Sequence, residues 1–108
     1  MAITVNLRYI GNNGAARRFA EEMTASGMVA LIRAEAGNLR YEYYQSLDEP
    51  DVVLLIDNWT DQAAIDAHHA SPMMATIAAL REKYDLHMIV ERFVSIEDNA
   101  TDERFIRK

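Results

Sequence analysis

Hydrophobic side chains recur at two different spacings along this chain, and the order of those spacings constrains the fold more than any other feature. Apolar and polar residues alternate from Ile3 to Ile10, which indicates a strand with one apolar face. From Ala15 to Ala34 the apolar residues recur at the spacing of a helix, and Gly27 predicts a kink or break within it. Strands are further expected at residues 39–46, 52–59 and 86–96, and short helices at 61–70 and 72–84.

The order of these elements is β-α-β-β-α-β, with the second helical segment divided in two. This order is typical of the ferredoxin-like arrangement, an α+β fold with an antiparallel four-stranded sheet. Residues 52–59 (VVLLIDNW) are apolar on both faces and are expected to form a central strand. One domain is expected over residues 1–96, because no repeat or linker divides them, followed by a solvated tail at 97–108.

The helical segments carry their own signals. The segment over 15–34 is expected to bury one face, which comprises Ala16, Phe19, Ala20, Met23, Gly27, Ala30, Leu31 and Ala34. Thr60 or Asp61 is expected to cap the next helix, because each offers a side-chain oxygen to free backbone amides. Ser71 is expected to cap the last helix, with Pro72 at its first position.

Helices on one face of such a sheet leave its other face open. We expect the open face to carry Val53, Leu55 and Trp59, joined by Ile89 and Phe93 if the parity of the last strand allows. Leaving an apolar patch in water costs roughly 25 cal/mol per Å². The sequence therefore predicts a homodimer in which two sheets face each other and close into a barrel-like core.

Composition argues against several classes of function. The net charge of −6 disfavours nucleic acid as a partner, because phosphate backbones are bound by concentrated lysine and arginine. The absence of cysteine removes disulfides, thiolate zinc sites and cysteine nucleophiles. No apolar run approaches the roughly 18 residues of a membrane span, and MAITVNLRYI lacks the pattern of a signal peptide. We therefore expect a cytoplasmic protein that has no membrane partner.

The stretch NWTDQAAIDAHHASPMM, residues 58–74, holds an adjacent histidine pair. His68 and His69 project about 100° apart on a helix and do not converge on one ion, so no metal site is predicted. His69 is expected to be exposed. Ala64 and Ala67 leave space around His68, whose ring can act as a base near neutral pH or as a hydrogen-bonded structural group.

Other polar residues of the strands are candidates for a binding pocket. Asn6 and Arg8 lie on the less apolar face of the first strand, and Tyr44 is placed similarly on the second. In isolation these side chains would meet solvent or the edge of a dimer. On a face covered by a partner they would become the polar groups of a pocket.

Asp57 and Trp59 share one face of the central strand. An acid on an otherwise apolar face needs a partner, and an ion pair with Arg8, Arg40 or Arg92 is the expected role of Asp57. Trp59 is expected mainly to pack, because aromatic rings dominate small cores, and it can also line a pocket.

The combination of GNLRYEYYQS, a strand ending in DNW, and DQAAIDAHHASP resembles the antibiotic biosynthesis monooxygenase (ABM) family of dimeric α+β barrels. The resemblance extends from Ile3 to Ile96. It implies a buried pocket in each subunit and, as in some members, oxygenation of a small aromatic quinol or polyphenol without metal or flavin. In that interpretation His68 is the base, while Asn6, Arg8 and Trp59 shape and polarise the pocket.

The departures from relatives leave alternatives open. Polyketide-type relatives have asparagine at the position of Leu55 and tyrosine at that of Ile65, and quinol-type relatives often have histidine at that of Met73. Leu55 and Met73 are therefore candidates for the pocket lining whose side chains differ from those of the relatives. The pocket tryptophan of heme-degrading relatives would fall at His68 and their heme ligand near Ala78, so heme degradation is not expected. A small-molecule isomerase that uses His68, or a binding protein without chemistry, is the alternative.

Overall fold

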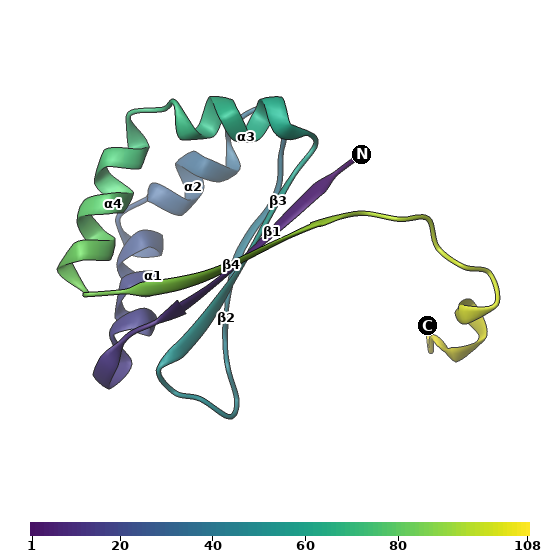
Figure 1. Ribbon diagram of the computed structural model, residues 1–108, viewed down its shortest axis with the longest axis horizontal. Helices are drawn as coiled ribbons and strands as arrows, with labels where there is room; N and C mark the ends of the chain where they lie inside the picture. The colour runs from purple at the N-terminus through teal and green to yellow at the C-terminus, as the bar shows by residue number, and fades with distance from the viewer.

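Four antiparallel strands form one sheet in the order β2-β3-β1-β4, and the computed structural model describes all 108 residues (Figure 1). The strands are β1 (Ile3–Ile10), β2 (Asn38–Gln45), β3 (Val52–Trp59) and β4 (His87–Val94). The helices are α1 (Ala15–Ala25), α2 (Met28–Arg33), α3 (Gln62–His69) and α4 (Met73–Lys83), with short 3-10 turns at Asn12–Gly14 and Asp102–Phe105. The predicted ferredoxin-like α+β fold is confirmed, with β3 inside the sheet and both helical segments divided in two.

Gly27 separates α1 from α2, as predicted. Its φ of +86° lies in the left-handed region that favours glycine. Helix α1 buries the predicted face up to this point. The break rotates the chain, so that α2 buries Val29 and Ile32 instead. The predicted positions beyond the glycine are exposed and were therefore wrong: Ala30, Leu31 and Ala34.

The caps of α3 and α4 differ. Asp61 caps α3, where its Oδ1 atom accepts a hydrogen bond of 2.9 Å from the backbone N–H of Ala64. Ser71 does not cap α4, because its hydroxyl is buried without a hydrogen-bond partner, and that prediction was wrong. The turn between the two helices is therefore held by backbone hydrogen bonds, including that from Ser71 N–H to the His68 carbonyl at 3.0 Å.

Strand register decides which residues face the helices. Leu7 of β1 pairs with Leu55 of β3, and both side chains are buried in the core. Tyr9 pairs with Val53, and Trp59 occupies the same face of β3 at 1% exposure. The prediction that Val53, Leu55 and Trp59 lie on the open face is therefore wrong. The apolar sides of β1 and β3 coincide in register and form one core under the helices.

The open face carries a mixed set of side chains. Its residues are Thr4, Asn6, Arg8, Arg40, Glu42, Tyr44, Leu54, Ile56, Asn58, Ile89, Glu91 and Phe93. Ile89 and Phe93 do lie on this face, where they are 50% and 49% exposed. A register shift between Asn38 and Arg40 leaves Leu39 out of the pairing, and its side chain is exposed.

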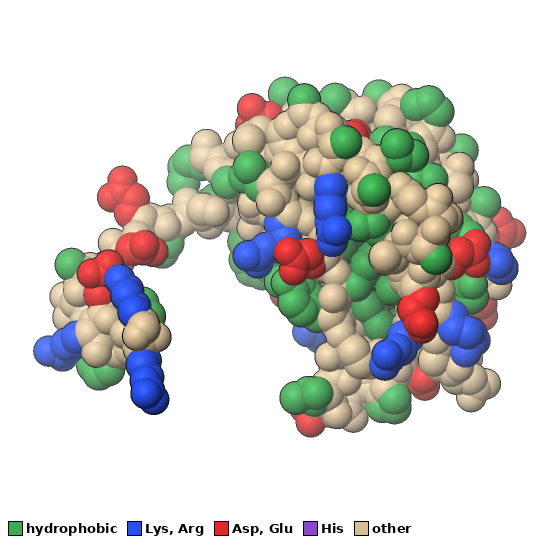
Figure 2. Space-filling model, turned by 180° about the vertical axis from the view of Figure 1, so that it is seen from behind, with side chains coloured by type: hydrophobic (Ala, Val, Ile, Leu, Met, Phe, Trp, Pro, Cys, Tyr) green, Lys and Arg blue, Asp and Glu red, His purple; other side chains and the backbone are tan.

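Strand β4 and the C-terminal residues extend beyond the helices. β4 forms one edge of the sheet and is exposed along its whole length. The N–H of Ser95 still donates to the carbonyl of Ala2 at 3.1 Å. Residues 97–108 then leave the body and form a separate lobe joined by a narrow neck (Figures 1 and 2). None of the helices has the length and hydropathy that crossing a membrane requires.

Candidate active site

His68 is the one buried histidine of the chain, at 5% exposure, and it lies in the last turn of α3. Its ring packs against Trp59, with 4.9 Å between the ring centroids. Its Nδ1 atom lies 2.7 Å from Oε1 of Glu35. Its Nε2 atom makes no hydrogen bond, while its neighbour His69 is exposed as predicted. His68 therefore has one ring nitrogen held and the other available.

The contact with Glu35 decides which ring nitrogen carries the proton. A carboxylate only accepts hydrogen bonds, so Nδ1 is assigned the proton that it donates to Glu35, and Nε2 keeps its lone pair. The carboxylate also stabilises the imidazolium that forms when Nε2 takes a proton. From the sequence, His68 could be either a hydrogen-bonded structural group or a base. In the structure one ring nitrogen is hydrogen-bonded and the other is free, so the same side chain has both features.

Glu35 is a residue of the candidate site that sequence reasoning missed. It lies in the turn between α2 and β2, 33 positions from His68, and no local pattern connects the two. Gly37 allows their approach, because its φ is +85° and a Cβ atom there would lie 2.6 Å from Cβ of Ala64 on α3. The Gly37 carbonyl also accepts a 2.9 Å hydrogen bond from Thr60 N–H. The turn therefore packs directly on the start of α3.

His68 lines a cavity of about 270 Å³ between the helix-covered face of the sheet and helices α3 and α4. The apolar lining consists of Val5, Leu7, Leu55, Ile65, Met74, Ile77, Met88 and Val90. The polar lining consists of Tyr41, Asp57, His68, His69, Arg81 and Arg92. A mostly apolar cavity with a few convergent polar groups is the usual form of a small-molecule site.

Asp57 lies in this cavity without the predicted ion pair. Its side chain is 8% exposed, no salt bridge includes it, and its Oδ1 atom is buried without a hydrogen-bond partner. Arg8 and Arg40 lie on the opposite face of the sheet, and Arg92 donates to the side chain of Gln62 instead. Burial raises the pKa of Asp57 to about 6, although the nearby His68 ring opposes this shift. The carboxyl is therefore a titratable group of the cavity.

Trp59 and Met73 do not line the cavity. Trp59 is 1% exposed, and its indole N–H is buried without an acceptor while its ring supports His68. Met73 packs against the core, and its neighbour Met74 lines the cavity. Because consecutive helical residues point about 100° apart, the cavity position belongs to Met74.

Arg81 and Tyr9 form a second polar pair that sequence reasoning missed. The guanidinium of Arg81 donates to the Tyr9 hydroxyl from Nε at 3.1 Å and from a terminal nitrogen at 2.9 Å. Burial of Tyr9 raises its pKa above the ordinary value, although the charge of Arg81 opposes the shift. The phenol therefore stays neutral, and Arg81 brings a positive charge to the cavity lining.

Three predicted pocket residues lie away from this cavity. Asn6, Arg8 and Tyr44 occupy the alternate positions of β1 and β2 and therefore point to the open face. Tyr44 donates from its hydroxyl to Oε2 of Glu42 at 2.6 Å, and Arg8 is exposed. Of the predicted site residues, the structure brings together Leu55, Asp57, Trp59 and His68.

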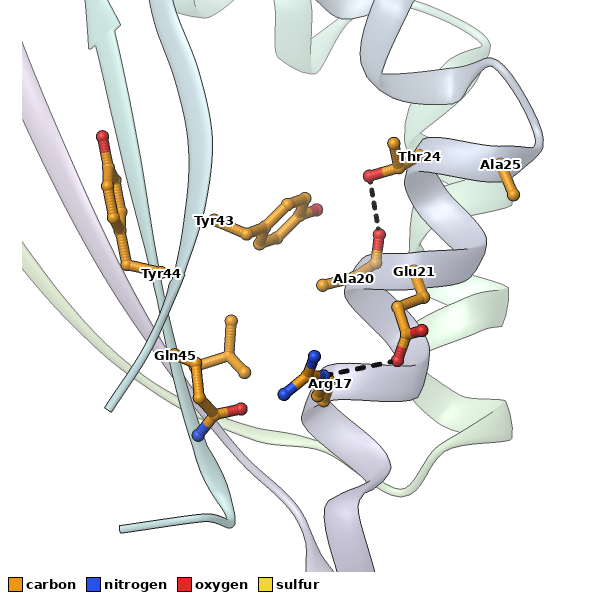
Figure 3. A pocket seen from close by; sticks show the side chains of 9 residues that line it. Arg17, Ala20, Glu21, Thr24, Ala25, Tyr43, Tyr44 and Gln45 are labelled. Atoms are coloured by element: carbon orange, nitrogen blue, oxygen red, sulfur yellow. Dashed lines mark hydrogen bonds and ion pairs between the residues drawn. The ribbon is translucent and has the colours of Figure 1, made fainter. Parts of the chain in front are cut away.

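A wider and more open hollow lies between α1 and β2 (Figure 3). Its volume is about 510 Å³, and Tyr43 points into it from β2 while Tyr44 points away from the helix. Arg17 and Glu21 pair across one turn of α1 at 3.6 Å, and the Thr24 hydroxyl donates to the Ala20 carbonyl. Its charged groups are thus paired with each other at the surface, and it holds no buried base.

Residues 2–80 match the family described as Antibiotic biosynthesis monooxygenase. This range runs from the start of β1 into α4 and includes Glu35, Asp57 and His68. The chain therefore belongs to the ABM family.

Solved structures share the fold over nearly the whole chain. Rv0793 from Mycobacterium tuberculosis is 22% identical with a TM-score of 0.75, and the alignment covers 93% of this chain and 100% of that one. PA3566 from Pseudomonas aeruginosa is 24% identical with a TM-score of 0.75, covering 89% and 95%. SnoaB, a cofactor-independent oxygenase from Streptomyces nogalater, is 18% identical with a TM-score of 0.74, covering 92% and 97%. No curated protein sequence matches the chain.

Proposed function

We propose that this ABM protein is a cofactor-independent monooxygenase that oxidises a small aromatic quinol or polyphenol beside His68. The observation that carries the proposal is the free Nε2 atom of a buried histidine in a largely apolar cavity, with Nδ1 held 2.7 Å from Glu35. A base in this setting removes the proton of a bound phenol where water does not compete. Membership of the ABM family and the shared fold of SnoaB support the reaction class.

Loss of the phenolic proton prepares the substrate for dioxygen. The phenolate is a better electron donor than the phenol, so it can pass one electron to dioxygen, after which the two radicals combine in a carbon–oxygen bond. Overall, one quinol and one dioxygen give one hydroxyquinone and one water. The quinol supplies all the electrons, so the reaction needs no external reductant.

The size of the cavity limits the substrate. A dry cavity of roughly 150 Å³ holds benzene. The cavity of about 270 Å³ therefore suits an aromatic compound of one or two fused rings. The guanidinium groups of Arg81 and Arg92 in the lining favour a substrate oxygen that becomes negative during the reaction.

Oxygen uptake with one-ring and two-ring hydroquinones and catechols tests the proposal. Wild-type protein is expected to raise uptake above autoxidation and to form a hydroxyquinone. His68→Ala is expected to lower the rate by about 10²–10⁴-fold, because the base is removed. His87→Ala, which changes an exposed histidine on β4, serves as the matched control. Uptake at background level, with wild type and His68→Ala indistinguishable, would contradict the proposal.

A second candidate function is isomerisation of a small molecule without dioxygen. The presence of two titratable groups, His68 and Asp57, in one cavity favours it, because such a pair can move a proton between two atoms of a substrate. Turnover that persists under strict exclusion of oxygen would support isomerisation. Ligand binding without turnover in either atmosphere would indicate a non-catalytic binding protein.

We also propose that the protein forms a homodimer through the open face of the sheet. The face is less apolar than the sequence suggested, yet Ile89 and Phe93 are half exposed on it, and Asn6 Oδ1 is buried there without a hydrogen-bond partner. A second copy would cover the apolar groups and offer partners to the polar ones. Light scattering at micromolar concentration measures the assembly directly, and a monomer would contradict the proposal. Phe93→Glu is expected to weaken a dimer, whereas Phe105→Glu in the tail leaves this face intact.

A further inference from the structure

The proposed oxygenation needs a proton donor as well as a base, and the cavity holds a second buried titratable group besides His68. Once dioxygen has joined the substrate anion, the outer peroxide oxygen carries negative charge and must be protonated before the oxygen–oxygen bond breaks. We infer that Asp57 gives this proton and then removes the hydrogen of the same ring carbon, and is thus the second catalytic residue of the cavity. The inference rests on the proposed monooxygenase function.

The position of Asp57 suits proton transfer to a bound ligand. It lies between Leu55 and Trp59 on the helix-covered face of β3 and lines the same cavity as His68. The side chain is 92% buried, since 8% of it is exposed, and Oδ1 has no hydrogen-bond partner. Burial disfavours the ionised carboxylate in such surroundings, and this effect outweighs the His68 ring, the Trp59 indole N–H and Arg81, which favour the ionised form. The neutral acid is therefore favoured more strongly than at the surface.

The charged and titratable groups around Asp57 come from every neighbouring element. They are Tyr9 on β1, Glu35 in the α2–β2 turn, Tyr41 and Tyr43 on β2, His68 and His69 on α3, Arg81 on α4 and Arg92 on β4. Three of the four potential cations among them are hydrogen-bonded elsewhere, Arg81 to Tyr9, His68 to Glu35 and Arg92 to Gln62, and the fourth, His69, is exposed.

These partners leave the carboxyl of Asp57 without a fixed ion pair. Burial then raises the pKa of Asp57 to about 6, and the charges of His68 and Arg81 oppose this rise without cancelling it. A group with a pKa in this range can both give and take a proton at a pH close to neutral.

The proton cycle closes with these two residues alone. His68 takes the phenolic proton, and Asp57 protonates the peroxide to a hydroperoxide. The Asp57 carboxylate next takes the hydrogen from the ring carbon that bears the hydroperoxide, and the electron pair of that bond forms a carbonyl as the oxygen–oxygen bond breaks. The leaving hydroxide takes the proton from His68 and becomes water. Both residues return to their starting states.

Naphthohydroquinone, a two-ring quinol, is the probe that tests Asp57. Asp57→Asn keeps the size and polarity of the side chain but removes its proton. Formation of hydroxynaphthoquinone is expected to fall about 100-fold or more in this variant. Oxygen uptake should fall much less, because the unprotonated peroxide breaks down to naphthoquinone and hydrogen peroxide. Asp48→Asn, in the exposed β2–β3 turn, is the matched control and should keep the product ratio of wild type.

The outcomes separate this inference from the proposed function. The role of Asp57 alone would be overturned by an active wild type together with an Asp57→Asn variant that forms hydroxynaphthoquinone within twofold of the wild-type rate and releases no more hydrogen peroxide than wild type. A wild type that never raises oxygen uptake would overturn both proposals.

A carboxyl-carbon NMR titration of the wild-type protein tests the same role without relying on a variant that folds. The Asp57 signal is assigned by its absence from Asp57→Asn or by selective labelling. We expect it to titrate near pH 6. A carboxyl that stays ionised down to pH 5 would overturn the inference, because no proton would be available to give.

Discussion

The two faces of the sheet are built from alternate residues of the same strands, yet their polar groups behave differently. On the open face two pairs of polar side chains are hydrogen-bonded, Tyr44 to Glu42 at 2.6 Å and Asn58 to Thr4 at 2.7 Å, while Oδ1 of Asn6 has no partner. On the helix-covered face Asp57 has no such partner. Exclusion of solvent strengthens electrostatic interactions and shifts the pKa values of buried groups, whereas solvent screens charges and keeps pKa values close to their ordinary range. The contrast teaches that burial, more than residue type, distinguishes the side of the sheet that carries the candidate site.

Truncating one leucine on each face gives the largest expected contrast in stability. Leu55→Ala empties a buried position and is expected to lower the free energy of unfolding by about 2–5 kcal/mol. Leu54→Ala changes the preceding residue, half-buried on the open face, and is expected to cost less than about 1.5 kcal/mol. Urea unfolding followed by Trp59 fluorescence measures both. Equal losses would break the comparison and indicate that the open face is covered in solution.

The pH dependence of stability sharpens the comparison at Asp57. Its pKa rises from 3.8 to about 6 on folding, so the unfolded chain loses this proton first as the pH increases. The stability that the neutral carboxyl provides is complete below pH about 4 and is lost as the pH rises through about 6. The loss is about 3 kcal/mol for a shift of this size.

Comparing wild type with Asp57→Asn isolates this effect, because every other carboxyl is common to both proteins. Unfolding at pH 4 and at pH 7.5 should give a stability difference that grows in favour of the variant at the higher pH. Asp48→Asn, an exposed change, should follow wild type. If the stability of wild type and Asp57→Asn depended on pH in the same way, folding would not raise the pKa of Asp57.

Two glycines with the same backbone conformation test how tightly the turn packs beside His68. Gly37 and Gly27 have φ values of +85° and +86°, but only at Gly37 would a Cβ atom meet other atoms, at 2.6 Å from Ala64. Gly27→Ala is expected to cost about 1 kcal/mol from its backbone alone, and Gly37→Ala about 2–3 kcal/mol. Thermal unfolding measures both, and oxygen uptake should fall only for Gly37→Ala, since Glu35 would shift. Similar effects of the two changes would show that the turn is loose.

Removing one hydroxyl from each side gives the smallest expected contrast. Tyr9→Phe takes away the acceptor of two hydrogen bonds from Arg81 and is expected to cost about 1–2 kcal/mol. Tyr44→Phe, on the open face, is expected to stay within about 0.5 kcal/mol. Denaturant unfolding resolves the difference if both variants share the same slope. A larger loss for Tyr44→Phe would place a partner on the open face.

The order of elements and the break at Gly27 could be predicted because their signals are local. Alternation marks a strand, helical spacing marks a helix, and a glycine with positive φ marks an interruption. The assignment of faces to β3 could not be predicted in this way, because VVLLIDNW is apolar on both sides. Pairing of Leu7 with Leu55 resolved the choice.

The candidate site was predictable only where its members are close in sequence. Asp57, Trp59 and His68 belong to one strand–turn–helix segment, and all three were candidates. Glu35 and Arg81 were missed, because the contacts of Glu35 with His68 and of Arg81 with Tyr9 span 33 and 72 positions. No period or spacing rule reaches across such separations.

The sequence by itself determined the fold class, the buried helix face before Gly27, and His68 as the candidate base. Tertiary structure alone decided that Glu35 is hydrogen-bonded to His68, that Asp57 forms no salt bridge, and that Arg8 lies across the sheet from both. The physical reason is that local patterns set which side chains are apolar or chargeable. Their proton affinities depend on which distant groups share the same water-excluded space.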